Sequence, residues 1–259
     1  MSTFRAQVRV ISLVLGIGVV AACLPGAALN LRAAPAEKTA SQSRSGKPDP
    51  ALSLEEVLAR FDDKQKATNT LVASFTEHKE LKLLEEPVVS QGEFFYTRPN
   101  QVRWEYLDPD RKVFVITEDR YTAYYPALKR AEEVPIKKFV GKRLFRFLGV
   151  GQSIEDLGKY YDFALADESD VPGTYLLLLT PRKKKLRDRV AEMKIWVDGE
   201  SFLPSRLQYV EADGDTTLLA FTGMKSNIEV SAKRFMLDLP QDVVVSQTFN
   251  GFSLGQRSF

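Results

Sequence analysis

The chain has 259 residues, of which 44% are hydrophobic and 27% charged, as is ordinary for a folded soluble domain. Its 36 lysines and arginines almost balance 34 aspartates and glutamates, and this balance gives no support for nucleic-acid binding. That length suits one large β domain or two small ones. The 16 phenylalanines and nine tyrosines favour strands over a helical bundle.

The first 36 residues are predicted to be a signal peptide. Arg5 and Arg9 precede an apolar run at residues 10–24, and small residues and prolines follow it. A positive start, a short apolar core and a small-residue exit are typical of secretory signals. The apolar run is shorter than the roughly 20 residues that span a bilayer comfortably. We therefore expect export, with a cleavage site at residues 26–28 or 34–36.

The only cysteine, Cys23, lies at the end of this apolar run. Residues 20–23, VAAC, resemble the lipobox of bacterial lipoproteins, although Val20 stands where Leu is usual. Two interpretations stay open: Cys23 is a lipidation site, or it leaves with the cleaved signal. In either case we expect the mature domain to have no disulfide.

The rest of the chain divides into three parts. Residues 37–52 lack large apolar side chains and are predicted to be a flexible leader. The folded domain is expected at residues 53–247, with a C-terminal tail at 248–259. Ser53 and Glu56 form a capping-box pattern, and apolar residues at helical spacing then predict a helix to about Thr68.

Short alternating segments bounded by Pro, Asn, Asp or Gly follow the helix and predict an antiparallel meander. The expected strands are residues 71–84, 88–97, 101–106, 112–117, 121–125, 130–134, 160–166, 174–181, 190–197, 204–211, 216–225 and a last piece at 234–237. Residues 137–148 interrupt the alternation with a helical pattern, and a second helical stretch is expected at 153–158. The fold class is therefore mainly β (α+β): one curved antiparallel sheet of about ten or eleven strands, an N-terminal helix and an internal helical insertion.

Catalytic and metal chemistry find little support among the residues. The single histidine, His78, is expected on a strand facing solvent, and the chain has no G-x-S-x-G elbow for it to serve. One His and one Cys nearly exclude a zinc site of nitrogen and sulfur ligands, and no nucleotide-binding glycine motif is present. We expect a protein without cofactor that is not an enzyme.

Residues 181–189, PRKKKLRDR, form a strongly basic run. This run is interpreted as a solvated hairpin tip between two strands, and contact with anionic lipid headgroups or an acidic partner stays open.

Aromatic and aliphatic side chains are the most informative group. In an ordinary sandwich they would fill the core, but one curved sheet with two helices leaves part of them free to line an apolar cavity, where each buried CH₂ of a ligand contributes about 0.8 kcal/mol. The candidate cavity residues are Phe94, Tyr96, Val102, Trp104, Tyr106 and Phe114 on the strands, and Leu144, Phe145, Phe147 and Leu148 in the insertion.

Residues 91–106, QGEFFYTRPNQVRWEY, resemble the signature of the outer-membrane lipoprotein carrier family, the LolA-like periplasmic chaperones. Weaker similarities follow in the same order as in that family: VASFT at 72–76, YYP at 124–126, LTP at 179–181 and RFMLDLP at 234–240. The resemblance covers most of residues 54–245.

That resemblance implies an unclosed β-barrel with a helical lid over an apolar cavity. The cavity of such proteins receives acyl chains of lipoproteins from an inner-membrane releasing transporter, and the carrier passes them to an outer-membrane receptor. By resemblance, Arg98 would be the arginine that hydrogen-bonds to the lid helices and holds the empty cavity shut, and the insertion would be the lid. A buried or half-buried guanidinium would suit this switch, because it keeps its charge and seeks carbonyl acceptors. The implied protein is a periplasmic monomer in transient contact with membranes.

Three alternatives stay open. A lipid-anchored receptor or sensor of the same fold would require acylation of Cys23. A carrier of another amphiphile, such as a glycolipid, would use the same apolar walls. A hydrolase or adhesion domain would have a core filled by its own side chains.

Overall fold

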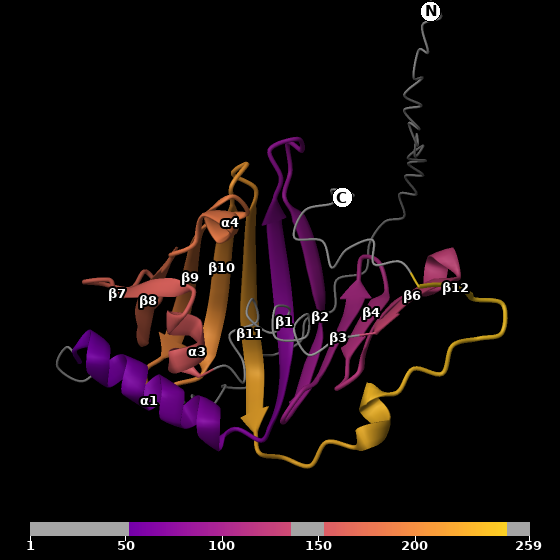
Figure 1. The fold of residues 1–259 in the computed structure, drawn as a ribbon, viewed down its shortest axis with the longest axis horizontal. Helices are drawn as coiled ribbons and strands as arrows, with labels where there is room; N and C mark the ends of the chain where they lie inside the picture. The colour runs from indigo at the N-terminus through magenta and orange to yellow at the C-terminus, as the bar shows by residue number, and fades with distance from the viewer. Residues whose placement is uncertain (1–51, 136–152, 248–259) are drawn as a thin grey trace, which may run out of the picture. The chain divides into compact units, whose positions relative to one another are not determined.

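The computed structural model describes residues 52–135 and 153–247, and these contain twelve strands (Figure 1). The strands are β1 (Thr70–Glu80), β2 (Val88–Thr97), β3 (Gln101–Asp108), β4 (Lys112–Ile116), β5 (Arg120–Tyr125), β6 (Arg130–Pro135), β7 (Tyr161–Leu165), β8 (Thr174–Pro181), β9 (Val190–Asp198), β10 (Pro204–Glu211), β11 (Thr216–Ser226) and β12 (Val244–Ser246).

All twelve strands belong to one sheet, in the order β12-β6-β5-β4-β3-β2-β1-β11-β10-β9-β8-β7. Strands β2 to β6 lie on one side of β1, and β11 to β7 lie on the other, so the two halves meet where β1 pairs with β11. The order of the described strands ends at β12 and β7, so the sheet is unclosed. The prediction of one long unclosed antiparallel sheet is confirmed. The count is twelve instead of ten or eleven, and β12 pairs with β6 in parallel.

Helix α1 (Leu54–Ala67) begins with the expected capping box. The Glu56 amide donates to the Ser53 hydroxyl at 3.3 Å, and the Ser53 amide donates to the Glu56 carboxylate at 2.8 Å. This exchange satisfies two amides that a helix start otherwise leaves unpaired. Helix α3 (Ile154–Gly158) lies against α1, because Asp62 accepts a 2.8 Å hydrogen bond from the Ile154 amide. The helical predictions at 53–68 and 153–158 are confirmed.

The predicted strand at residues 234–237 is wrong. Residues Ala232–Phe235 form the 3-10 helix η2, and the Ser231 hydroxyl accepts from the Lys233 amide at its start. Phe235 is buried against Phe95 and Val115 on the sheet. The alternating pattern therefore reflects packing of a turn on the sheet and not pairing within it.

The basic run and His78 lie as the sequence predicts. His78 is exposed on β1. The run forms the connection from β8 to β9, which contains the short helix α4 (Lys184–Arg187). Lys184 pairs with Asp188 at 2.9 Å and Arg182 with Asp162 at 2.7 Å, so acidic side chains nearby offset part of its charge.

The two faces of the sheet differ in what packs on them, because successive side chains of a strand point to opposite sides. We call inner the face whose alternating residues form one cluster with Val57 and Phe61 of α1, both fully buried. The outer face carries a smaller cluster centred on Phe95, Val113, Val115 and Phe235. Beyond the last residue of β5, the 3-10 helix η1 (Pro126–Leu128) leads to β6.

Candidate functional site: the inner face of the sheet

The six strand residues predicted to line a cavity lie side by side on the inner face. Strand register places Phe94 opposite Trp104 and Trp104 opposite Phe114, while Tyr96 lies opposite Val102. Every one of the six is buried: Phe94, Tyr96, Val102, Trp104, Tyr106 and Phe114. The alternation of β2, β3 and β4 therefore gathers the predicted residues on one surface.

Phe75 of β1 joins this group although the sequence did not single it out as a site residue. The centre of its ring lies 4.8 Å from the ring centre of Trp104 and 4.9 Å from the ring centre of Tyr106. Both pairs are packed edge to face. Gly92 of β2 makes this position possible, because a Cβ there would lie 2.7 Å from Phe75 Cζ and 2.1 Å from the Glu105 carbonyl oxygen. A glycine in a strand interior is typical of such a close approach.

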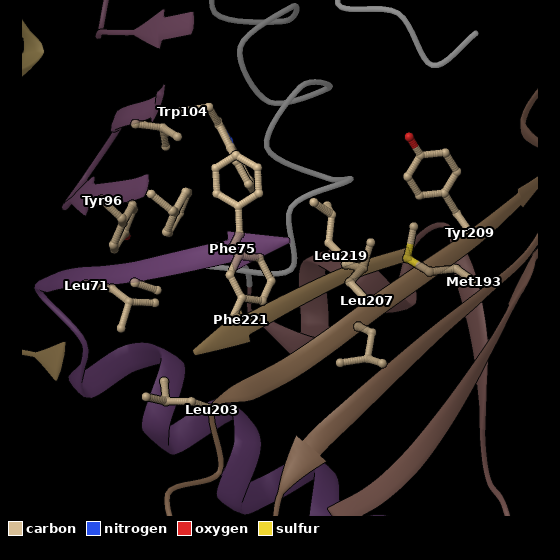
Figure 2. Packing of buried hydrophobic residues seen from close by; sticks show 14 of the residues in the cluster. Leu71, Phe75, Tyr96, Trp104, Met193, Leu203, Leu207, Tyr209, Leu219 and Phe221 are labelled. Carbon is tan, nitrogen blue, oxygen red and sulfur yellow. The ribbon is translucent and has the colours of Figure 1, made fainter. Parts of the chain in front are cut away.

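The second half of the sheet extends the apolar surface beyond the predicted residues. Figure 2 shows Phe75 and Phe221 between the residues of the two halves, with Leu219, Leu207 and Met193 continuing on one side. The alternation of β8 to β11 is visible in the sequence, but its mostly aliphatic residues stand out less than the aromatic residues of the first half. The inner face is thus apolar across both halves.

Arg98 follows β2 and contacts the C-terminal end of α1. Its Nη2 donates to the Gln65 carbonyl at 2.7 Å and to the Thr68 carbonyl at 3.2 Å, and its Nε donates to the Thr68 carbonyl at 3.3 Å. The last carbonyls of a helix lack intrahelical partners and attract a cation. The residue is exposed, so the expectation of a buried or half-buried arginine is wrong: the guanidinium reaches α1 over the rim of the sheet.

Tyr96 connects Arg98 to the inner face. Burial raises the pKa of the Tyr96 hydroxyl, and the charge and hydrogen bond of Arg98 oppose part of that rise. The arginine therefore contacts both α1 and one of the predicted cavity residues.

A polar corner, formed by Glu77, Lys79, Tyr106 and Lys112, borders the apolar surface. The Tyr106 hydroxyl donates to Glu77 Oε1 at 3.0 Å, Lys79 Nζ lies 3.4 Å from Glu77 Oε2, and Lys112 Nζ lies 4.2 Å from the Tyr106 ring centre. Burial, followed by the Glu77 charge, raises the pKa of Tyr106 well above its usual value. Burial also lowers the pKa of Lys112, and Lys79 adds to this effect. Sequence reasoning missed this corner, because its members come from three strands.

The remaining predicted site residues lie outside the described residues. They are Leu144, Phe145, Phe147 and Leu148, in the insertion at 137–148, and Cys23. The signal, the leader and the C-terminal tail lie outside the described residues as well. Within residues 52–135 and 153–247, no group of three or more His, Cys, Asp or Glu side chains is arranged to hold a metal ion. In the same ranges, none of the helices has the length and apolar character needed to cross a bilayer.

One long unclosed sheet with a buried apolar inner face and a helix packed on it defines the class of protein: a single-sheet β protein with one apolar face. The family model described as outer membrane lipoprotein carrier protein LolA matches residues 66–238. The chain belongs to this family, and the resemblance found in residues 91–106 is confirmed.

Individual relatives are distant in sequence. An outer-membrane lipoprotein carrier protein from Methylococcus capsulatus is 24% identical over 179 residues, which cover 69% of this chain and 82% of the relative. Another from Alkalilimnicola ehrlichii is 23% identical over 197 residues, covering 76% of this chain and 85% of the relative. Among solved structures, an uncharacterized conserved protein from Thermus thermophilus aligns with a TM-score of 0.49 and 14% identity over 74% of this chain and 97% of that one.

Proposed function

We propose that this protein is a non-enzymatic periplasmic carrier that binds the acyl chains of lipoproteins at its inner face and delivers them toward the outer membrane. The observation that carries the proposal is the apolar inner face, which runs across both halves of the sheet in a chain of the lipoprotein carrier family. Transfer of each CH₂ group from water to such a surface is favourable by about 0.8 kcal/mol.

The proposal includes partners and a route. The carrier takes lipoproteins from an inner-membrane releasing transporter and passes them to an outer-membrane receptor, as a monomer that contacts membranes only in transit. The basic run at 181–189 and the family membership of the chain are compatible with such contacts. The insertion, with Leu144, Phe145, Phe147 and Leu148, is proposed as the lid.

Arg98 is proposed as the lid switch, acting through α1, which would move together with the lid. Its hydrogen bonds to the Gln65 and Thr68 carbonyls tie the end of α1 to the rim of the sheet. A guanidinium keeps its charge at all accessible pH values, and it would be left without these acceptors if α1 moved. Acyl chains that enter beneath the helices must offset the loss of these bonds, which keeps loading reversible.

Native mass spectrometry of the protein purified from its own cells tests the ligand class. We expect an acylated lipoprotein bound to it, and release of lipoproteins from spheroplasts that receive the purified protein. A bound glycolipid without lipoprotein would instead support a carrier of another amphiphile. Absence of any bound lipid, together with failure to release lipoproteins, would contradict the proposal.

A lipid-anchored receptor is the second candidate, because VAAC at residues 20–23 resembles a lipobox. Mass spectrometry of the mature N-terminus separates the two. A free terminus near Glu37 supports the soluble carrier, whereas an acylated Cys23 supports the anchored receptor.

A further inference from the structure

The chain contains two tryptophans, and their indole N–H groups have different partners. On β9, Trp196 Nε1 donates to Asp170 Oδ1 at 2.6 Å. On β3, Trp104 is 2% exposed and its Nε1 is buried, yet no residue of the described ranges accepts a hydrogen bond from it. A buried donor without an acceptor costs about 1–3 kcal/mol, and native structures rarely keep one without a reason.

Three aromatic rings lie close to the Trp104 indole. Ring centres of Phe94, Phe75 and Phe221 lie 4.6, 4.8 and 5.9 Å from that of Trp104. A phenylalanine at this position would keep an aromatic ring there and avoid the unpaired donor. An aromatic contact alone does not require the N–H group, and the described residues supply no acceptor for it.

Trp104 also stands at the border between the apolar surface and the polar corner. Tyr106, whose hydroxyl donates to Glu77, is the next residue of β3 on the same face. Residues two apart on a strand lie about 7 Å from each other. A ligand whose hydrocarbon lies along the inner face and whose polar end reaches the corner would place its linking atoms near Trp104.

We propose that the Trp104 indole N–H donates a hydrogen bond to the carbonyl oxygen of the ester or amide that links a fatty acyl chain to its lipoprotein. The inference rests on the proposed function and adds a specificity determinant to it. The inner face thereby distinguishes acyl chains, which carry a carbonyl, from alkyl chains of the same length, which the hydrophobic effect alone cannot separate.

The test compares two synthetic lipopeptides of equal chain length. In one, the N-terminal cysteine carries a diacylglyceryl group with two ester carbonyls; in the other, a dialkylglyceryl group with ether links. Their affinities for wild-type protein, Trp104→Phe and Trp196→Phe are measured by displacement of a fluorescent hydrocarbon probe. Trp196→Phe is the matched control, because it makes the same substitution at an indole that already has an acceptor.

Wild-type protein and Trp196→Phe are expected to bind the ester about 5-fold to 10-fold more tightly than the ether, the ratio that one hydrogen bond provides. In Trp104→Phe the preference should vanish while ether affinity is unchanged. In wild-type protein, one of the two indole proton resonances should shift with the ester and not with the ether. An unchanged ester preference in Trp104→Phe, or an equal loss of both affinities, would overturn the inference. If neither lipopeptide binds wild-type protein, the proposed function itself fails.

Discussion

The two faces of strands β2, β3 and β4 are built from alternating residues of the same segments but are completed differently. On the outer face, Phe235 of η2 packs against Phe95, Val113 and Val115, and the Arg234 guanidinium lies 4.6 Å from the Phe95 ring centre. On the inner face, Phe94 and Trp104 belong to a larger apolar cluster that contains an indole donor without an acceptor in the described ranges.

Charged groups are paired by the chain on both faces, and on the inner face Glu77 accepts from Tyr106. Glu105 on the outer face accepts from Arg103 at 2.8 Å and from Arg111 at 3.0 Å, and Arg103 also donates to the Arg234 carbonyl at 3.0 Å. The chain itself thus pairs the charges of Glu105 and Arg103 on the outer face. Under the proposed function, the inner face is the one that an acyl chain contacts.

Neighbouring phenylalanines of β2 give the largest expected effect. Phe94→Ala and Phe95→Ala each remove a buried ring, fully buried and 6% exposed respectively, so both should lower the free energy of unfolding by about 3–4 kcal/mol. Only Phe94→Ala should weaken lipopeptide binding per folded molecule. Urea denaturation and lipid displacement measure the two quantities, and equal loss of binding in both variants would remove the distinction between the faces.

A methyl group at Gly92 should break the packing of the inner face. Gly92→Ala places a Cβ against the Glu105 carbonyl and the Phe75 ring, and we expect a loss of about 2–3 kcal/mol in unfolding free energy. Gly223→Ala is the control: it has open space but a φ of +61°, and should cost only about 1–2 kcal/mol. Equal losses in thermal or urea denaturation would show that close approach at Gly92 matters no more than backbone conformation.

Removal of the Arg98 guanidinium should change cargo release more than folding. Arg98→Leu leaves the Gln65 and Thr68 carbonyls without this donor, which we expect to lower stability by only about 1 kcal/mol or less. The amount of lipoprotein that the variant transfers to the receptor, measured by pull-down of the receptor, should fall clearly. Arg182→Leu, which removes a surface ion pair with Asp162, serves as control. Unchanged transfer by Arg98→Leu would exclude the switch.

The smallest expected effect is that of acidic pH, which should slightly lower the stability that Glu105 contributes on the outer face. Burial alone would raise the pKa of the Glu105 carboxyl, but hydrogen bonds from Arg103 and Arg111 lower it overall. A carboxyl with a lowered folded pKa stabilises the fold above its unfolded pKa of about 4.3, and this contribution is lost as the pH falls through the folded value. Glu105→Gln should therefore flatten the stability profile below about pH 4.3 without altering lipid affinity; an unchanged profile would contradict this assignment.

Local sequence patterns predicted most helices and strands correctly, but they did not predict which distant strands pair. The capping box at Ser53 and Glu56, and the alternation that places Trp104 beside Phe94 and Phe114, depend on residues close in sequence. The pairing of β1 with β11, the parallel contact of β12 and the turn at Phe235 depend on tertiary packing and were not readable.

The site was predicted in part, for similar reasons. Arg98 was identified only through the resemblance, because nothing in the sequence shows that it reaches the end of α1. The polar corner and the unpaired Trp104 donor need coordinates, since hydrogen-bond pairing is a property of neighbours in space.

Photocrosslinking tests the central claim most directly. A lipopeptide with a photoreactive group in its acyl chain is bound to the wild-type protein and irradiated, and the modified residues are mapped by mass spectrometry. The account predicts crosslinks on inner-face residues such as Phe94, Trp104 and Leu207. Crosslinks confined to the outer face, on Phe95 or Val113, would contradict it.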